Sequence, residues 1–396
     1  MKKILIIHPA LIDGGAERVL IDYLKILGSF DKKYQTDLIF LENRQNKHIE
    51  EIPKNIDIKF ILSDIESEFY IYSSLNLANG YYFSSWFNGI KRRINERLFT
   101  LINANNYDII IDFHRNSSSF NNFINYYDLA PRIKVIYWLH SEFYINSWLS
   151  DKPYYTHILS KYTHFIAIND QMQECCHQAL TELNLASKPI KLIYNPIDID
   201  NIQQKSEQID AHDRELLNQE FILQVSRLDE IKNHHQMIEI YAQLKQMGIT
   251  EKLYIIGGGE ITQKALQEQI NHLGLQEDCL LLGERLNPYP FMKRAKLFFH
   301  TSKGEGFGLV LAESMVCGTP VICYDCPTGP KTILDNGKYG VLVPLGDKAT
   351  FIQQTYSLIK NNELRQSYIE KLPESIERFC FKTITKQLEN YLDTLL

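Results

Sequence analysis

Residues 302–313 of this 396-residue chain read SKGEGFGLVLAE, and this stretch decides the fold. The apolar run before it, residues 296–301, is typical of a buried parallel strand, whereas the residues after Gly308 have the apolar spacing of a helix. The glycines between them let the backbone turn tightly and bring the first amides of the helix close to an anionic ligand. The sequence therefore predicts a strand, a glycine turn and a helix that together bind a nucleotide-type ligand.

Two carboxylates lie in this stretch, Glu305 in the turn and Glu313 eight positions later in the helix. At the rise of an α-helix they are about 12 Å apart. Carboxylates beside phosphate groups are unfavourable unless they accept hydrogen bonds from hydroxyl groups. The pair therefore favours a ligand with diols at two places, such as a sugar joined to a nucleoside.

The same residues resemble a known family. Glu305 and Glu313 match the E-x7-E motif of retaining glycosyltransferases, and their surroundings, EGFGLVLAE, are similar to glycosyltransferase family 4. Downstream, GTPVI at residues 318–322 resembles the family's next strand, and DCPTGP at residues 325–330 resembles a loop in one of its branches. The chain thus resembles a bacterial glycosyltransferase of this family.

The resemblance implies a fold class and a domain organisation. The fold is α/β of the GT-B type, in which two Rossmann-like parallel-sheet domains face each other across a cleft. We expect an N-terminal acceptor-binding domain over residues 1–196 and a nucleotide-sugar-binding domain over residues 197–375. A helix within residues 376–396 is expected to cross back to the first domain.

The chain as a whole alternates between strand and helix patterns. This alternation predicts parallel sheets covered on both faces, and ligands of such sheets bind at the carboxyl ends of the strands. The strand candidates are residues 4–7, 37–41, 56–62, 108–113, 135–140 and 165–168 in the first half, and 221–226, 253–256, 280–282 and 296–301 in the second.

Composition and charge exclude several classes of protein. The net charge of −6 and the pI near 6.1 disfavour broad nucleic-acid binding, and the 44% hydrophobic content is enough for two domains with full cores. The seven cysteines do not resemble a secreted disulfide framework, so we expect a reduced, cytoplasmic location. No segment is apolar enough to cross a membrane, so any contact with the inner membrane is expected to be peripheral.

A second motif follows the strand predicted over residues 221–226. Arg227 ends this strand and Lys232 comes five positions later, so both can converge on a diphosphate and neutralise the charge of a leaving group. Such a pair alone is usually a solvated surface. The RLDEIKN context resembles the family, in which the matching Arg and Lys bind the donor diphosphate and no metal ion is needed.

The resemblance assigns further contacts with the donor. Glu313 is expected to hold the ribose diol, and Glu305 the hydroxyl groups of the donor sugar. Gly257 and Gly283, each at the end of a predicted strand, are expected to lie near the nucleotide. The remaining expected donor contacts are Gly306, Phe307, Gly308 and Leu309.

The first domain carries its own candidates. Gly14 and Gly15 open a helix, which alone is read as a cap, whereas the resemblance places them beside the donor phosphates. His140 ends a strand, where a side chain points into a ligand cleft, and the resemblance gives it a supporting catalytic role near the donor sugar. The expected acceptor-side residues are Asp112, His114 and Glu142.

Residues 69–87 are rich in aromatic side chains, and basic residues follow at positions 91–93 and 97. Aromatic groups beside basic ones suit sugar stacking, a phosphate-linked acceptor or a lipid interface. The alternative is a long packed loop followed by a solvated basic helix. The sequence leaves both interpretations open.

Together with the resemblance, these observations predict a retaining, metal-independent glycosyltransferase that needs no cofactor. It would transfer a hexose or an N-acetylhexosamine from a nucleotide diphosphate donor, with UDP as the default, to a bacterial surface glycan such as lipopolysaccharide or capsule, or to a lipid-linked oligosaccharide. The alternatives are a sugar-nucleotide epimerase of GT-B architecture and a non-catalytic sugar-nucleotide-binding subunit. A dinucleotide oxidoreductase is disfavoured, because the G-x-G-x-x-G fingerprint is absent after the first strand.

Overall fold

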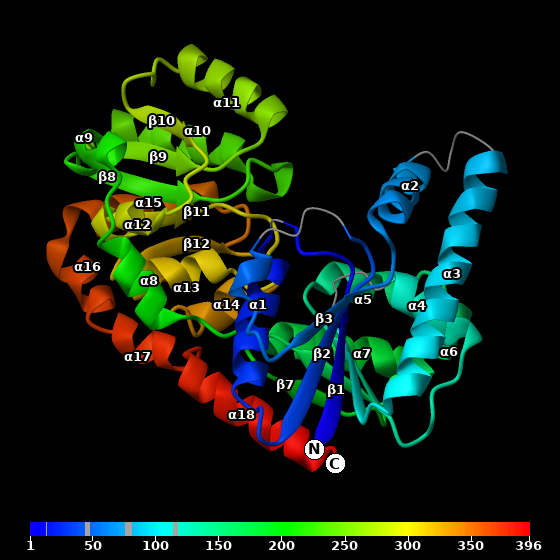
Figure 1. Cartoon of the computed structure of the whole chain (residues 1–396). Coiled ribbons are helices and arrows are strands. Elements are labelled where there is room, and N and C mark those ends of the chain that lie inside the picture. Colours follow the sequence, from blue (N-terminus) through cyan, green and yellow to red (C-terminus); the bar gives the residue numbers. More distant parts are fainter. Residues whose placement is uncertain (13, 44–47, 76–80, 114–117) are drawn as a thin grey trace. The chain divides into compact units, whose positions relative to one another are not determined.

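The computed structural model describes residues 1–12, 14–43, 48–75, 81–113 and 118–396 (Figure 1). The chain divides into two compact units. The first contains Met1–Pro196 together with Thr385–Leu396, and the second contains Ile197–Ile384. Each unit has a parallel sheet of its own.

Within the described residues, the sheet of the first unit has seven parallel strands in the order β3-β2-β1-β4-β5-β6-β7. Its middle is apolar on both faces, since Ile109, Ile110 and Ile111 of β4 are fully buried, as expected for a parallel sheet covered on both sides. The strands are β1 (Lys2–His8), β2 (Tyr34–Phe40), β3 (Asp57–Phe60), β4 (Ile109–Asp112), β5 (Lys134–Trp138), β6 (His164–Ala167) and β7 (Ile190–Leu192).

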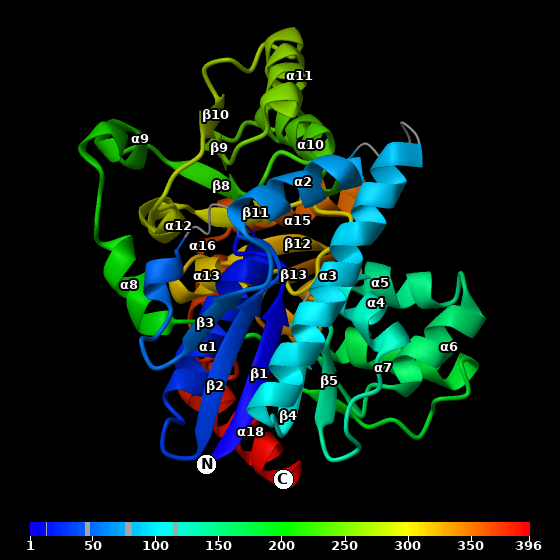
Figure 2. The same ribbon diagram turned by 45° about the vertical axis from the view of Figure 1, so that its right-hand side comes forward.

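Helices connect these strands and cover the sheet. Tyr23 of α1 packs edge-on against Trp138 of β5, with ring centroids 4.5 Å apart. Figures 1 and 2 show α2 and α3 side by side. The helices are α1 (Gly15–Gly28), η1 (Ile49–Glu51), α2 (Asp64–Leu75), α3 (Tyr81–Asn105), α4 (Ser118–Tyr126), α5 (Glu142–Trp148), α6 (Lys152–Ser160) and α7 (Asp170–Glu182). Within the described ranges, no helix is both long and apolar enough to cross a bilayer.

The second unit repeats the plan with six parallel strands, in the order β10-β9-β8-β11-β12-β13, within the part of the chain described. One face of this sheet packs against Met237, Leu266 and Phe351, which come from three different helices. The strands are β8 (Phe221–Val225), β9 (Lys252–Ile256), β10 (Cys279–Gly283), β11 (Leu297–His300), β12 (Val321–Asp325) and β13 (Val341–Pro344).

The helices of the second unit end with one that returns to the first unit. They are α8 (Ile199–Ser206), η3 (Ala211–Asp213), α9 (Arg214–Leu217), η4 (Glu230–Lys232), α10 (His234–Gln246), α11 (Glu260–His272), α12 (Tyr289–Arg294), α13 (Leu309–Val316), α14 (Pro330–Ile333), α15 (Lys348–Lys360), α16 (Asn362–Ile369), α17 (Leu372–Glu377) and α18 (Phe381–Thr394). From Thr385 onward α18 belongs to the first unit. There Asp393 accepts a hydrogen bond from Tyr34 at 2.5 Å, and Glu389 pairs with Lys33 at 2.6 Å.

The strand order reverses once in each sheet, because β1 lies between β2 and β4, and β8 lies between β9 and β11. At such a point the loops at the carboxyl ends of the strands diverge, and ligands of open α/β sheets bind there. The predicted α/β class with two parallel sheets is confirmed. Two strands were not predicted from the sequence, namely β13 and β7, which is short and has no fully buried residue.

Candidate active site

Glu305 is the centre of a charged cluster at the carboxyl ends of β8 and β11. Its Oε1 atom accepts hydrogen bonds from Lys232 Nζ at 2.5 Å and from His300 Nε2 at 2.7 Å. The side chains of Glu305 and Lys232 are 10% and 14% exposed. Burial alone would raise the pKa of Glu305, but the hydrogen bond from His300 and the charge of Lys232 outweigh burial and lower the pKa to about 2. The carboxylate is therefore ionised at neutral pH.

A second loop fixes the glycine turn that carries Glu305. The Glu305 amide donates to the Pro327 carbonyl at 2.8 Å, and the Thr328 amide donates back to the Glu305 carbonyl at 2.7 Å. Gly329 follows with a φ of 79°, and a Cβ at this position would collide with the carbonyl oxygen of Phe307. The residues after β12 thus hold the turn in place.

The short helix η4 brings Lys232 to Glu305. Its carbonyls are tied to the start of the glycine turn, where the Lys303 amide donates to the Ile231 carbonyl at 2.7 Å and Thr301 Oγ1 donates to the Lys232 carbonyl at 3.2 Å. The structure therefore brings together two of the predicted site residues, which are 73 positions apart in the sequence.

Arg227 lies outside this cluster. Its guanidinium group pairs with Asp229 at 2.9 Å, and its side chain is 65% exposed. The backbone beside it is held tightly, because a Cβ at Gly257 would collide with the Ser226 carbonyl, and the Gly257 amide donates to the Gly283 carbonyl at 3.0 Å. The predicted residues Gly257 and Gly283 thus join the ends of three neighbouring strands and support the segment that carries Arg227.

Glu313 lies on α13. Its Oε1 atom accepts a hydrogen bond from the hydroxyl group of Tyr289 at 3.5 Å. The helix begins at Leu309, and Gly308 before it has a φ of 88°, in the left-handed region. Tyr289 was not predicted from the sequence. It lies on α12, so its approach to Glu313 depends on how α12 and α13 pack.

Two further predicted donor contacts, Gly306 and Phe307, hold the glycine turn against the rest of the second unit. The Gly306 carbonyl accepts a hydrogen bond from Thr328 Oγ1 at 3.1 Å. The ring of Phe307 is buried and packs edge-on against Phe379, with centroids 5.5 Å apart. Phe307 therefore anchors the turn with its side chain, and the donor contacts assigned to this turn stay predictions.

Two of the expected acceptor-side residues have partners within the first unit. Asp112 is buried, and its Oδ2 atom accepts a hydrogen bond from Tyr162 at 2.6 Å. Glu142 lies 3.8 Å from the sulfur of Cys175. His114 lies outside the described residues. The acceptor roles of these three residues stay predictions.

The other candidates of the first unit lie near the carboxyl ends of β1 and β5. Gly15 is the first residue of α1, and a Cβ at Gly14 would collide with the carboxylate of Glu17. His140 is buried, and its ring centroid lies 4.4 Å from that of Phe113. The donor contacts assigned to these residues stay predictions.

A buried polar chain behind Glu305 was missed by the sequence analysis. His300 Nδ1 lies 3.0 Å from Gln224 Nε2, which also donates to Ser226 Oγ at 3.0 Å, and Ser226 Oγ lies 3.1 Å from His234 Nε2. Burial lowers the pKa of His234 to about 4, so its imidazole is neutral at pH 7. The sequence does contain an indication of this chain, because each of two apolar strands has a polar residue near its end, Gln224 in β8 and His300 in β11.

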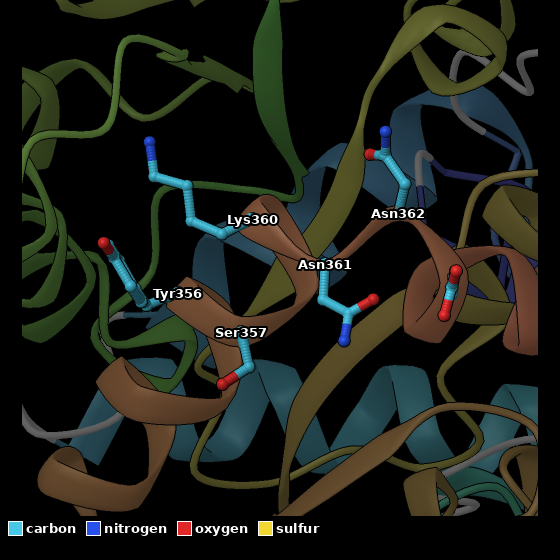
Figure 3. Close-up of a pocket in the computed structure, with 6 residues that line it drawn as sticks. Tyr356, Ser357, Lys360, Asn361 and Asn362 are labelled. Carbon is cyan, nitrogen blue, oxygen red and sulfur yellow. The ribbon is translucent and has the colours of Figure 1, made fainter.

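A surface cavity of about 620 Å³ lies where α15 meets α16 (Figure 3). It shares no residue with the cluster around Glu305. Its lining is polar and comes from one continuous segment, namely Tyr356, Ser357, Lys360, Asn361, Asn362 and Glu363.

Solved structures share this fold over the whole chain. The structure of HepE from Anabaena in complex with UDP-glucose matches with a TM-score of 0.74 and 20% identity, covering 100% of both chains. A glycosyltransferase from Rickettsia africae matches with a TM-score of 0.73 and 19% identity, covering 100% of this chain and 98% of the other. These similarities place the chain in the GT-B fold class.

The similarity to a known family lies in the second unit. Residues 205–374 match the family described as glycosyl transferases group 1. An N-acetylgalactosamine-N,N'-diacetylbacillosaminyl-diphospho-undecaprenol 4-alpha-N-acetylgalactosaminyltransferase from Campylobacter jejuni is 34% identical over 209 residues, which are 53% of this chain and 55% of that protein. The chain spans about half the length of the curated relatives it matches. The matched residues 205–374 include Lys232, Glu305 and Glu313, so this part of the chain is similar to the group 1 glycosyl transferases.

Proposed function

We propose that the protein is a retaining glycosyltransferase that uses a nucleotide diphosphate sugar, by default a UDP-hexose or UDP-N-acetylhexosamine. The observation that carries this proposal is the Glu305 carboxylate, which is ionised and held through Oε1 alone. Among the described residues, none donates a hydrogen bond to its Oε2 atom. That oxygen is available to accept hydrogen bonds from the hydroxyl groups of a donor sugar.

Two cationic side chains are proposed to bind the diphosphate. The ion pair between Arg227 and Asp229 is exposed and therefore weak, so the guanidinium group can turn towards an anionic ligand. Lys232 would give up its hydrogen bond to Glu305 and bind a phosphate oxygen of the donor instead. Their positive charges stabilise the negative charge of the departing nucleotide, the task that a metal ion performs in other enzymes. We therefore propose that transfer needs no metal.

The proposed reaction exchanges one bond for another at the anomeric carbon. The acceptor hydroxyl oxygen bonds to this carbon as the bond from the carbon to the diphosphate oxygen breaks. Attack on the face that the leaving group occupies retains the configuration, and the departing phosphate oxygen takes the acceptor proton. Glu305 orients the sugar through its hydroxyl groups, and Glu313 holds the ribose diol.

The acceptor is proposed to be a bacterial surface glycan or a lipid-linked oligosaccharide. The name of the Campylobacter relative specifies a sugar on diphospho-undecaprenol as acceptor and an N-acetylgalactosaminyl group as the transferred sugar. An acceptor of this chemical class would bring the protein to the cytoplasmic face of the inner membrane. We propose that it works there as a peripheral protein.

The surface of α2 and α3 suits such a contact through its aromatic side chains. Phe69 and Trp86 stack with ring centroids 5.8 Å apart, although they are 48% and 60% exposed. The basic run beside them is partly neutralised, because Arg93 and Arg97 both pair with Glu66, at 3.2 and 2.7 Å. The long-loop interpretation of this segment is wrong for its described part, which is helical. Exposed rings rather than basic charge are thus proposed to contact lipid.

The proposal is tested with purified protein, EDTA, and UDP-, GDP- or ADP-sugars in the absence of acceptor. A ligand that binds the folded state raises its thermal stability, so we expect one nucleotide class to stabilise the protein and to be released slowly as free nucleotide. Conversion to an isomeric sugar nucleotide would identify an epimerase instead. Stabilisation by NAD and by no sugar nucleotide would refute the proposal.

A further inference from the structure

His300 occupies a central position behind the carboxylate of Glu305. It is the last residue of β11 and is 1% exposed. An ionised carboxylate only accepts hydrogen bonds, so the imidazole carries a proton on Nε2, the atom that lies 2.7 Å from Glu305 Oε1. The other ring nitrogen faces Gln224. The ring is therefore held from both sides.

Gln224 can hold this ring in either protonation state. Its Nε2 and Oε1 atoms lie 3.0 and 3.2 Å from His300 Nδ1. The amide can donate to a neutral imidazole through Nε2 or accept from an imidazolium through Oε1. Gln224 is fully buried and also bonded to Ser226, so its own position is fixed.

His300 and Lys232 both donate hydrogen bonds to Oε1 of Glu305. The two bonds have different fates when a sugar nucleotide binds. In the proposed function, Lys232 leaves Glu305 for the diphosphate. Among the described residues, His300 is then the remaining hydrogen-bond donor to the carboxylate of Glu305. We infer that His300 is a positioning residue, which keeps Oε1 of Glu305 in place and so directs Oε2 to the hydroxyl groups of the donor sugar. This inference rests on the proposed function.

The test compares two variants of similar side-chain size. His300→Leu removes the hydrogen bond, whereas His300→Gln places an amide donor near the position of Nε2. The probes are the sugar nucleotide that stabilises the wild type most and the bare nucleoside, which lacks the diphosphate and so leaves Lys232 paired with Glu305. We expect His300→Leu to lower kcat/KM for the sugar nucleotide about 10- to 100-fold, the range expected for one hydrogen bond to a charged group. Affinity for the bare nucleoside should stay within about twofold, and His300→Gln should recover most of the loss.

A double-mutant cycle then asks whether His300 acts through Glu305. In a Glu305→Gln background, His300→Leu should cause little further loss of sugar-nucleotide binding, because the carboxylate that it positions is already gone. If His300→Leu does not fold, Gln224→Leu serves instead, with a smaller expected loss, since it removes only the hydrogen bond that orients the ring.

The possible outcomes separate the two proposals. A wild type that neither binds nor turns over any sugar nucleotide would overturn the proposed function and this inference with it. A wild type that is active, with His300→Leu or its substitute Gln224→Leu equally active, would overturn the positioning role alone. Equal losses for the sugar nucleotide and for the bare nucleoside would also overturn that role, since they indicate general damage to the fold of the site.

Discussion

Replacing Glu305 with Gln removes a buried charge whose contribution to stability depends on pH. The pKa of Glu305 is about 2 in the folded protein, against an ordinary value of 4.5. Each pKa unit corresponds to about 1.4 kcal/mol, so the ionised carboxylate contributes about 3 kcal/mol to the free energy of unfolding at neutral pH. Because the pKa is lowered in the folded state, this contribution is complete above about pH 5 and is lost as the pH falls through 4.5 towards 2.

We therefore expect Glu305→Gln to lower the free energy of unfolding of the second unit by up to about 3 kcal/mol at pH 7 and by about half as much at pH 3. Urea unfolding followed by far-ultraviolet circular dichroism measures both values. Glu268→Gln is the matched control, because Glu268 is an exposed glutamate of α11. Trp86, Trp138 and Trp148 all lie in the first unit, so their fluorescence follows that unit separately. A destabilisation that is the same at both pH values would refute the reasoning.

Three further perturbations test other parts of the structure. Lys232→Met should weaken binding of the nucleoside diphosphate at least about tenfold, because it removes a charged hydrogen bond. Isothermal titration calorimetry measures this affinity, and an unchanged value would show that Lys232 does not bind the phosphates. Trp86→Ser should reduce sedimentation with lipid vesicles several-fold if the exposed aromatic pair enters the interface, and equal sedimentation would end the membrane proposal. Gly329→Ala should destabilise the second unit by about 2 kcal/mol or more, since it combines a positive φ with a collision at the Phe307 carbonyl; a variant that unfolds at the wild-type urea concentration would contradict this account.

The sequence was sufficient to predict the two parallel sheets and to single out Glu305 and Lys232 as candidate site residues, but not that the two side chains pair. Glu305 lies in a glycine turn after a predicted strand, so its place at the carboxyl edge follows from local pattern, whereas the choice of Lys232 also rested on the resemblance of its RLDEIKN context to the family. The partners of Glu305 do not follow in the same way. His300 meets Gln224 across 76 positions, and that meeting depends on the adjacency of β8 and β11 in the sheet. Without the strand order, a histidine in an apolar strand gives no indication of its partner.

Other differences arise where two local tendencies compete. The spacing of Arg227 and Lys232 predicted that both point to one ligand, yet in the structure Arg227 pairs with the neighbouring Asp229. Nearby opposite charges on an exposed loop associate readily, and sequence spacing does not exclude this. The aromatic residues of α2 and α3 favour strands or loops by propensity, but the two helices pack against each other, for example through the stacked rings of Tyr70 and Phe87.

The arrangement around Glu305 has a consequence for the order of binding affinities. A buried charge that loses its partner is strongly unfavourable, whereas a paired one is tolerated. A bare nucleoside diphosphate that takes Lys232 leaves Glu305 with His300 alone, whereas an intact donor also brings sugar hydroxyl groups to Oε2. The same cluster should therefore bind the donor more tightly than the nucleotide product, by more than the sugar contacts alone would give. In Glu305→Gln this preference should shrink, because an uncharged amide loses little when Lys232 turns away.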